Sequence, residues 1–371
     1  MSARAPRTIV CAGGGGVGKT TTSAALALAL ARLGKRTLVV TVDPARRLAS
    51  AMGVAIDADV HEAHVEPGVE GRLFALMPEP RRSTRTFIDL LFAEEPEAKA
   101  RMLENRVYLL LADAAAGMHE VVSLMLVAKA VAEHELDYLV IDTAPSRQGL
   151  DFVSYPGRLA TLYEGRAVGW LGNLARPNAP PEEDEQEERR GLLAAGRKRI
   201  EGLFGRLVNP RTLRDFAGLF AELALVKDRF ARLSRTSEHL LIGADTRYLL
   251  VAAPSGSAAA DARFLARRLK RLGQRPTALV LNRSDEGTPA WLGELDAARG
   301  LPPELAQALG AVHAELHTRQ RSGDLLAQSL GRDLPGVPAV RLPTLEERDP
   351  SDIVRALADL LRDHLPLLAG A

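Results

Sequence analysis

The sequence of 371 residues is poor in cysteine, in long apolar runs and in excess charge of either sign. Its single cysteine, Cys11, can form neither an internal disulfide nor a cysteine-based zinc site within one chain. No stretch reaches the roughly 18 apolar residues that a membrane span needs. The net charge of +1 gives no reason to expect nucleic acid as a partner. We expect a cytoplasmic protein, since no signal-peptide-like apolar region follows the N-terminus.

Short β-rich runs separated by helical spacing dominate what is present. Seven such runs predict strands, and most are continuously apolar, as in a parallel sheet that is buried on both faces. They occupy residues 7–12, 37–42, 72–77, 138–142, 247–253, 277–282 and 338–342. Helices are predicted between them, for example over residues 20–32 and 261–272. This alternation predicts an α/β fold with a doubly wound, mostly parallel sheet.

Two helix-rich regions without strand character interrupt the alternation. We therefore predict one domain over residues 1–371, in which an inserted helical subdomain accompanies the α/β core. The predicted core spans about 1–80, 136–154 and 241–371, and the subdomain about 81–135 and 155–240. A polar, acidic stretch at 176–190 within the subdomain predicts a loop.

The segment TIVCAGGGGVGKTTT, residues 8–22, contains a phosphate-binding pattern. Gly13, four further residues and then Gly18-Lys19-Thr20 have the spacing of a Walker A loop. Glycines allow backbone N–H groups to surround phosphate oxygens, and the next helix directs its positive end at them. Lys19 is expected at the β- and γ-phosphates and the Thr20 hydroxyl at Mg²⁺. The predicted nucleotide-binding residues are Gly13, Gly15, Gly16, Val17, Gly18, Lys19, Thr20 and Thr21.

A dinucleotide-binding loop is the alternative for the same glycines. Gly13, Gly15 and Gly18 also satisfy GxGxxG, and Asp43 ends the next strand, where an acid that binds ribose would lie. Such a loop has no need of the Lys-Thr pair, and Pro44 after Asp43 suits a switch loop. We therefore favour the Walker A interpretation.

Two carboxylates follow predicted strands, at the edge of the sheet where the loop lies. Asp142 ends the run YLVID in a Walker B position, where it would hold Mg²⁺ directly or through water. Asp43 would orient the attacking water or share the metal. Capping of a turn or helix is the structural alternative for both side chains.

Taken together, these motifs resemble the ArsA-type ATPases, the family of arsenite-pump ATPases and of ATPases that target tail-anchored membrane proteins. The matching segments are GGGGVGKTTT, VDPARRLASAMG for the first switch, IDTAPSRQGLDF for the second, LVLNR, and RLPTLEERDPSDI near the C-terminus. The resemblance implies a Mg²⁺-dependent ATPase that uses ATP to open and close a dimer. It further implies that Asn282, in LVLNR, contacts adenine.

Gly14 is the main departure from the family pattern, because it stands where the family has a signature lysine that crosses the dimer interface. Three consequences are open. A heterodimer could take the lysine from a paralogue, a local arginine (Arg46, Arg47 or Arg147) could replace it in a homodimer, or hydrolysis could be slow.

Other departures concern the partner. With one cysteine the chain lacks the family's metalloid-binding and dimer-bridging cysteines, so arsenite transport is not expected. In the second switch, Ser146-Arg147-Gln148 replaces Thr-Gly-His, which can alter coupling to a client. The helical run 216–233 could line a groove for an apolar client helix or pack within the subdomain. Only six methionines occur, and no segment is rich in them, as an adaptable groove would be.

Two other classes of protein remain possible. A positioning ATPase similar to ParA and MinD would use the amphipathic segment 352–365 for peripheral membrane association, although its mixed Asp and Arg suit docking on the protein itself. A regulatory nucleotide-binding subunit would bind ATP tightly and turn it over slowly.

Overall fold

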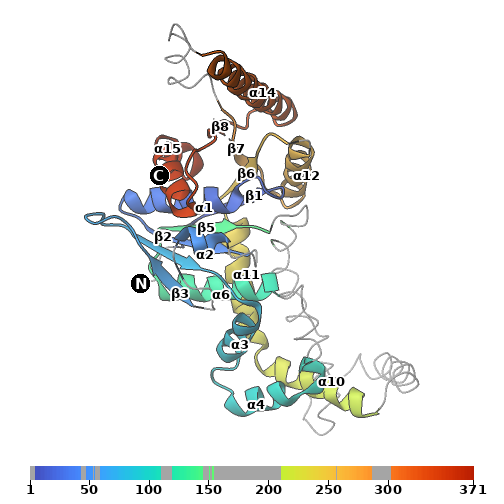
Figure 1. The fold of residues 1–371 in the computed structure, drawn as a ribbon. Helices are drawn as coiled ribbons and strands as arrows, with labels where there is room; N and C mark the ends of the chain where they lie inside the picture. Colours follow the sequence, from blue (N-terminus) through green and yellow to red (C-terminus); the bar gives the residue numbers. More distant parts are fainter. Residues whose placement is uncertain are drawn as a thin grey trace. The chain divides into compact units, whose positions relative to one another are not determined.

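The computed structural model describes residues 5–42, 47–52, 54, 59–109, 119–144, 150, 153, 210–255, 257–285 and 302–371 (Figure 1). The chain divides into two compact units. The first comprises residues 1–82, 126–154 and 238–371, and the second comprises 83–125 and 155–237. The predicted loop at 176–190, and the predicted helical region up to residue 209, lie outside the described residues.

One eight-stranded sheet forms the centre of the first unit, in the order β3-β4-β2-β5-β1-β6-β7-β8. All neighbouring strands are parallel except β3 and β4. The strands are β1 (Arg7–Gly13), β2 (Arg36–Thr41), β3 (Val60–Ala63), β4 (Arg72–Leu76), β5 (Tyr138–Asp142), β6 (Thr246–Ala252), β7 (Pro276–Leu281) and β8 (Ala339–Arg341). This sheet confirms the predicted α/β, mostly parallel fold.

All seven predicted strands are present, and among the described strands β3 is the one that the prediction omitted. Its sequence VHEA has four residues, and within the described part of the chain it pairs with β4 alone, at the edge of the sheet. An edge strand of this length needs no apolar run, because it is not covered on both faces. The apolar criterion used for the other strands therefore could not detect it.

Helices α1 (Lys19–Arg32), α2 (Arg47–Met52), α12 (Ala258–Arg271), α14 (Pro303–Asp333), α15 (Pro350–Leu361) and α16 (Leu365–Leu368) belong to the first unit, with the 3-10 turn η2 (Arg362–His364). Helix α1 connects β1 to β2 and is almost completely buried. The small alanine side chains that alternate with leucine in ALALALA, residues 25–31, allow the helix to lie close to the sheet.

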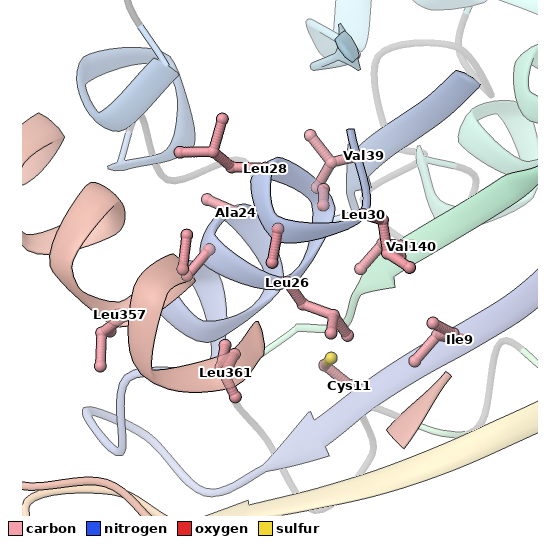
Figure 2. Close-up of a cluster of buried hydrophobic side chains, with 14 of the residues drawn as sticks. Ile9, Cys11, Ala24, Leu26, Leu28, Leu30, Val39, Val140, Leu357 and Leu361 are labelled. Atoms are coloured by element: carbon pink, nitrogen blue, oxygen red, sulfur yellow. The ribbon is translucent and has the colours of Figure 1, made fainter. Parts of the chain in front are cut away.

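Alternate side chains of the strands face opposite sides of the sheet. Ile9 and Val140 belong to the buried cluster around α1, where Leu26 points toward Cys11 (Figure 2). On the opposite face, Leu76 of β4 and Leu126 of α6 (His119–Glu133) line the same small cavity. Helices therefore cover both faces, as expected of a doubly wound sheet.

The amphipathic segment near the C-terminus forms α15 and packs on α1. Its apolar residues Val354, Leu357 and Leu361 are buried in the α1 cluster. Figure 2 shows Leu357 and Leu361 near α1. Asp349 caps the helix by accepting a hydrogen bond from the Ser351 amide at 2.8 Å. The apolar face of α15 is thus used inside the first unit.

The second unit contains α4 (Pro96–Glu104), α10 (Pro210–Leu225) and most of α3 (Pro80–Leu91) and α11 (Lys227–Ile242). Arg101 donates two hydrogen bonds to the buried carboxylate of Glu222, at 2.7 and 3.0 Å. Phe230 packs edge-on against Phe87. The predicted helical run 216–233 is divided near Val226, and both Val226 and Phe230 are buried.

None of the helices that the structure describes is both long and apolar enough to span a membrane.

Candidate nucleotide-binding site

A tight loop connects β1 to α1 and is held by close packing at two glycines. A side chain at Gly13 would place its Cβ 2.2 Å from the Val251 carbonyl oxygen of β6. Gly18 has φ 89°, and a Cβ there would lie 2.2 Å from the Asn282 amide nitrogen. Both positions therefore require glycine, for the approach of a neighbouring strand and for the left-handed turn that begins α1.

Lys19, the first residue of α1, is buried although it is charged. Its ammonium donates a hydrogen bond to the Gly14 carbonyl oxygen at 2.8 Å. The side chain thus folds back over the loop, where an anion held by the loop amides would meet it. Loop, helix start and ammonium converge as the Walker A pattern predicts.

Asp142 ends β5 beside the loop and is completely buried. Its Oδ2 accepts hydrogen bonds from the hydroxyls of Thr20 at 2.7 Å and Thr41 at 3.0 Å. Strand register explains this arrangement, because Asp142 is paired with Cys11 of β1 and with Thr41 of β2. The structure therefore brings together the two predicted metal ligands, which lie far apart in the sequence.

The donor set at Thr20 and Asp142 suits a small hard cation. Mg²⁺ prefers oxygen ligands and usually binds a few protein oxygens together with phosphate oxygens and water. A hydroxyl and a carboxylate oxygen 2.7 Å apart can both turn toward an ion beside the loop. When bound, Mg²⁺ would neutralise the charge on the nucleotide phosphates.

Thr41 was not among the predicted site residues. It is the last residue of β2, and its hydroxyl is the second donor to Asp142. The sequence offers a weak signal, a polar residue at the end of an otherwise apolar strand. Its role depends on the β2–β5 pairing, which the sequence pattern does not specify.

Asn282 directly follows β7 and is buried. Its side-chain amide donates a hydrogen bond to the Val17 carbonyl oxygen at 2.9 Å, so it braces the phosphate loop from the β7 side. This bond uses the nitrogen, while the predicted contact with adenine would be made by another part of the same amide. That contact stays a prediction.

Several predicted residues lie outside the described part of the chain. These are Asp43, Arg46, Arg147 and its neighbours Ser146 and Gln148, and nothing of the Arg47 side chain is described. Gly14 is described and is half-buried. A Cβ at Gly14 would lie 2.8 Å from a carboxylate oxygen of Asp261 in α12.

Cys11 lies within β1 and is fully buried. Burial raises the pKa of its thiol to about 12. The group therefore stays protonated at neutral pH and does not act as a nucleophile.

The sequence family described as anion-transporting ATPase matches residues 6–182, which include β1, the loop, α1 and Asp142. The predicted resemblance to the ArsA-type family of P-loop ATPases is thereby confirmed.

Proteins similar to this chain include some named ATPase get3 or GET3. The one from Schizosaccharomyces pombe is 28% identical over 204 residues, 55% of this chain and 56% of its own length. The one from Aspergillus terreus is 33% identical over 174 residues, 47% and 48% of the two chains. The one from Malassezia globosa is 31% identical over 211 residues, 57% and 58%. The chain thus spans about half the length of the curated relatives it matches.

Proposed function

We propose that this protein binds ATP with Mg²⁺ at the loop between β1 and α1 and hydrolyses it to ADP and phosphate. Lys19 and the loop amides hold the phosphates, and Thr20 and Asp142 hold the metal. Asp43 positions a water molecule, whose oxygen attacks the γ-phosphorus while the bond to the β–γ bridging oxygen breaks. Asn282 contacts the adenine through its amide oxygen, and the work takes place in the cytoplasm.

The observation that carries this proposal is the meeting of Lys19, Thr20 and Asp142 around one loop. Lys19 contacts the Gly14 carbonyl at 2.8 Å, and Thr20 contacts Asp142 at 2.7 Å. Phosphoryl transfer depends mainly on positioning and charge stabilisation, and these groups supply an ammonium and oxygen ligands for a cation. The match of residues 6–182 to a family of ATPases supports the same reaction.

We further propose that ATP closes a dimer and that this movement handles a protein client with an apolar helix. Support comes from relatives named ATPase GET3, and the second unit is the candidate client region. A dimer with a paralogue that carries the missing lysine competes with a homodimer in which an arginine replaces it.

One observation favours a regulatory subunit with slow turnover as the second candidate. The Asp261 carboxylate oxygen lies 2.8 Å from the place where a Cβ at position 14 would lie, so a carboxylate stands beside the loop position at which the family has a lysine. A negative charge there would oppose the developing charge of phosphoryl transfer.

Steady-state hydrolysis of MgATP over a range of protein concentrations tests the proposal. For a self-sufficient homodimer, specific activity should rise with concentration, and Asp43→Asn should abolish it while ATP binding persists. Lys19→Ala should remove binding itself, which calorimetry measures.

The remaining outcomes separate the candidates. Binding without turnover at any concentration would favour the regulatory subunit or a heterodimer, which adding the paralogue would distinguish. Absence of ATP binding by the wild-type protein would refute the proposed function.

A further inference from the structure

Helix α14 is anchored by its C-terminal half. A Cβ at Gly323 would lie 2.6 Å from the Ser284 hydroxyl oxygen, so glycine at this position lets the helix lie close to the segment after β7. Arg341, the last residue of β8, donates a hydrogen bond to Asp324 of α14 at 2.8 Å. These contacts hold the helix to the ends of two neighbouring strands.

The half of α14 before Gly323 is packed differently. Three of its residues border an open cavity of about 420 Å³ beside the phosphate loop, namely Thr318, Arg319 and Ser322. Within the part of the chain that the structure describes, no residue of α14 before Gly323 is buried. Helices in proteins owe most of their stability to the packing of one face. Core packing among the described residues therefore does little to hold this half, which can open locally without disturbing the core.

Two histidines one turn apart lie on this half, in the sequence His313-Ala-Glu-Leu-His317. Residues at i and i+4 share a face of a helix. The two imidazole rings lie side by side, with centroids 6.4 Å apart and planes inclined by 29°. His317 is exposed and His313 is half-buried. The helix thus places two imidazoles next to each other at an accessible position.

The spacing of the two rings suits chelation of one metal ion. Zinc lies about 2.0–2.1 Å from each imidazole nitrogen, so the two nitrogens must come within about 4 Å of each other. Side-chain rotation of the exposed His317 can close the remaining gap without movement of the backbone. Two histidines at i and i+4 are also the ligands that an HExxH helix supplies to zinc, although Glu315 stands one position later here.

Open space is available for the ion and its water ligands. Side chains of a helix lean toward its N-terminus, so an ion held by His313 and His317 would lie over the turn that contains Gly310. A Cβ at Gly310 would meet nothing within 4 Å. The lack of a side chain at this position leaves the approach to His313 unobstructed along the helix.

The charges around the pair bear on its affinity. Glu315 forms an ion pair with Arg319 on the same helix, which offsets the charge of that guanidinium. Arg321 lies one turn beyond His317, and its positive charge opposes a cation. Among the described residues, no group of three or more histidine, cysteine, aspartate or glutamate side chains could hold a metal. The described part of the chain therefore supplies two ligands, with water at the remaining positions.

We propose that His313 and His317 form a two-histidine site for a divalent transition metal ion such as Zn²⁺. Imidazole suits Zn²⁺, Ni²⁺ and Cu²⁺, whereas Mg²⁺ prefers oxygen ligands, so this site is chemically distinct from the pair of Thr20 and Asp142. The bound ion links two turns in the half of α14 that core packing does little to hold. It thereby stabilises this part of the helix, whether or not a nucleotide is bound.

Calorimetric titration of the 371-residue chain with Zn²⁺, without an affinity tag, tests the site. Excess Mg²⁺ occupies oxygen-based sites during the titration. His317→Gln should lower the Zn²⁺ affinity by at least about tenfold, the smaller loss seen when groups that merely support a metal ligand are changed. His64→Gln, at an exposed position outside α14, is the control and should keep the wild-type affinity.

A matched variant tests the spacing of the histidines rather than their number. The double change His317→Thr and Thr318→His exchanges two neighbouring exposed residues, so composition and net charge stay the same. The second imidazole then stands at i+5, on another face of the helix, and cannot share an ion with His313. This exchanged variant should lose Zn²⁺ affinity as His317→Gln does.

Hydrogen exchange locates the effect in the chain. Zn²⁺ at about ten times its dissociation constant should slow amide exchange in residues 309–317 of the wild type about tenfold. The same segment of the exchanged variant should exchange at a rate that does not depend on Zn²⁺.

Three results would overturn the proposal. They are absence of Zn²⁺ binding by the wild type, equal affinity in the wild type and the exchanged variant, and Zn²⁺ binding that leaves exchange in residues 309–317 unchanged. If the exchanged variant did not fold, the comparison of His317→Gln with His64→Gln would decide.

Discussion

Helices α1 and α14 both border the candidate nucleotide site, but they are packed in opposite ways. Eleven of the fourteen residues of α1 are buried, including the charged Lys19. In α14 only Gly323, Leu326 and Leu330 are buried among 31 residues. The phosphate side of the site is thus built into the core, whereas the cavity beside it is bordered by a helix anchored over one short stretch.

The difference in burial between α1 and α14 predicts different effects of substitutions in the two helices. Packing around α1 fixes the phosphate loop, because the start of the helix and the ends of β1 and β5 belong to the same buried structure. A change at an exposed position of α14 costs little core packing. We therefore expect substitutions near α1 to act on stability and on the metal, and substitutions at exposed positions of α14 to change stability little.

A matched pair of leucines gives the largest expected contrast. Leu26 of α1 is fully buried, while Leu325 of α14 is 59% exposed. Leu26→Ala should lower the free energy of unfolding by about 2–5 kcal/mol because it leaves a cavity in the core. Leu325→Ala should change it by less than about 0.5 kcal/mol. Urea denaturation measures both, and similar losses in the two variants would contradict the contrast.

The metal side of the site should respond next most strongly. Thr20→Val keeps the shape of the side chain but removes the hydroxyl that contacts Asp142. The gain in ATP affinity on adding Mg²⁺ should fall by about tenfold, because one oxygen ligand is lost. Titrations with and without Mg²⁺ would measure this gain.

Thr22→Val is the control for that experiment. Thr22 lies one turn inside α1, and its buried hydroxyl makes no hydrogen bond among the described residues. The variant should keep the wild-type response to Mg²⁺. If Thr20→Val kept it as well, the assignment of Thr20 to the metal would be wrong.

The smallest effect is expected where α1 ends. Arg32 donates a hydrogen bond to Glu66 at 3.1 Å, and this contact lowers the pKa of the Glu66 carboxyl from its ordinary 4.5 to about 2. The associated stability is present above about pH 4.5 and is lost as the pH falls toward about 2. Because Glu66 is 40% exposed, solvent screening limits this stability to less than about 1 kcal/mol.

Glu66→Gln should therefore be slightly less stable than the wild type near neutral pH, and the difference should shrink as the pH falls from about 4.5 toward about 2. Urea denaturation at about pH 6 and about pH 3 tests this. Glu346→Gln, at an exposed site, is the control and should show no such trend. A difference that grew as the pH fell would have the wrong sign.

The sequence was sufficient for the parts of the candidate site that have a local pattern. The glycine loop, Lys19 and Thr20 lie within one short segment, and Asp142 stands at the end of an apolar run, so each could be picked out without knowledge of the fold. The order of the strands and the contact of Thr41 with Asp142 were not predicted. Both depend on pairing between segments that are about a hundred residues apart.

The packing of α14 near the phosphate loop was equally hidden from sequence analysis. Its residues are polar and mostly exposed, so they give no strong periodic pattern. Gly323 looks like an ordinary helix-weakening residue until Ser284 and Arg341 are seen beside it. These two residues lie 57 positions apart in the sequence. Only the fold makes their shared contact with the helix visible.

The reaction of Cys11 with a thiol reagent would report how often β1 opens to solvent. As the single thiol of the chain, fully buried under the phosphate loop, it can react with a thiol reagent only when β1 opens to solvent. The rate of that reaction measures local opening of the strand that leads into the loop, without an added label or an engineered residue. A ligand that stabilises the closed loop should lower the reaction rate, whereas a ligand that contacts only the surface should leave the rate unchanged.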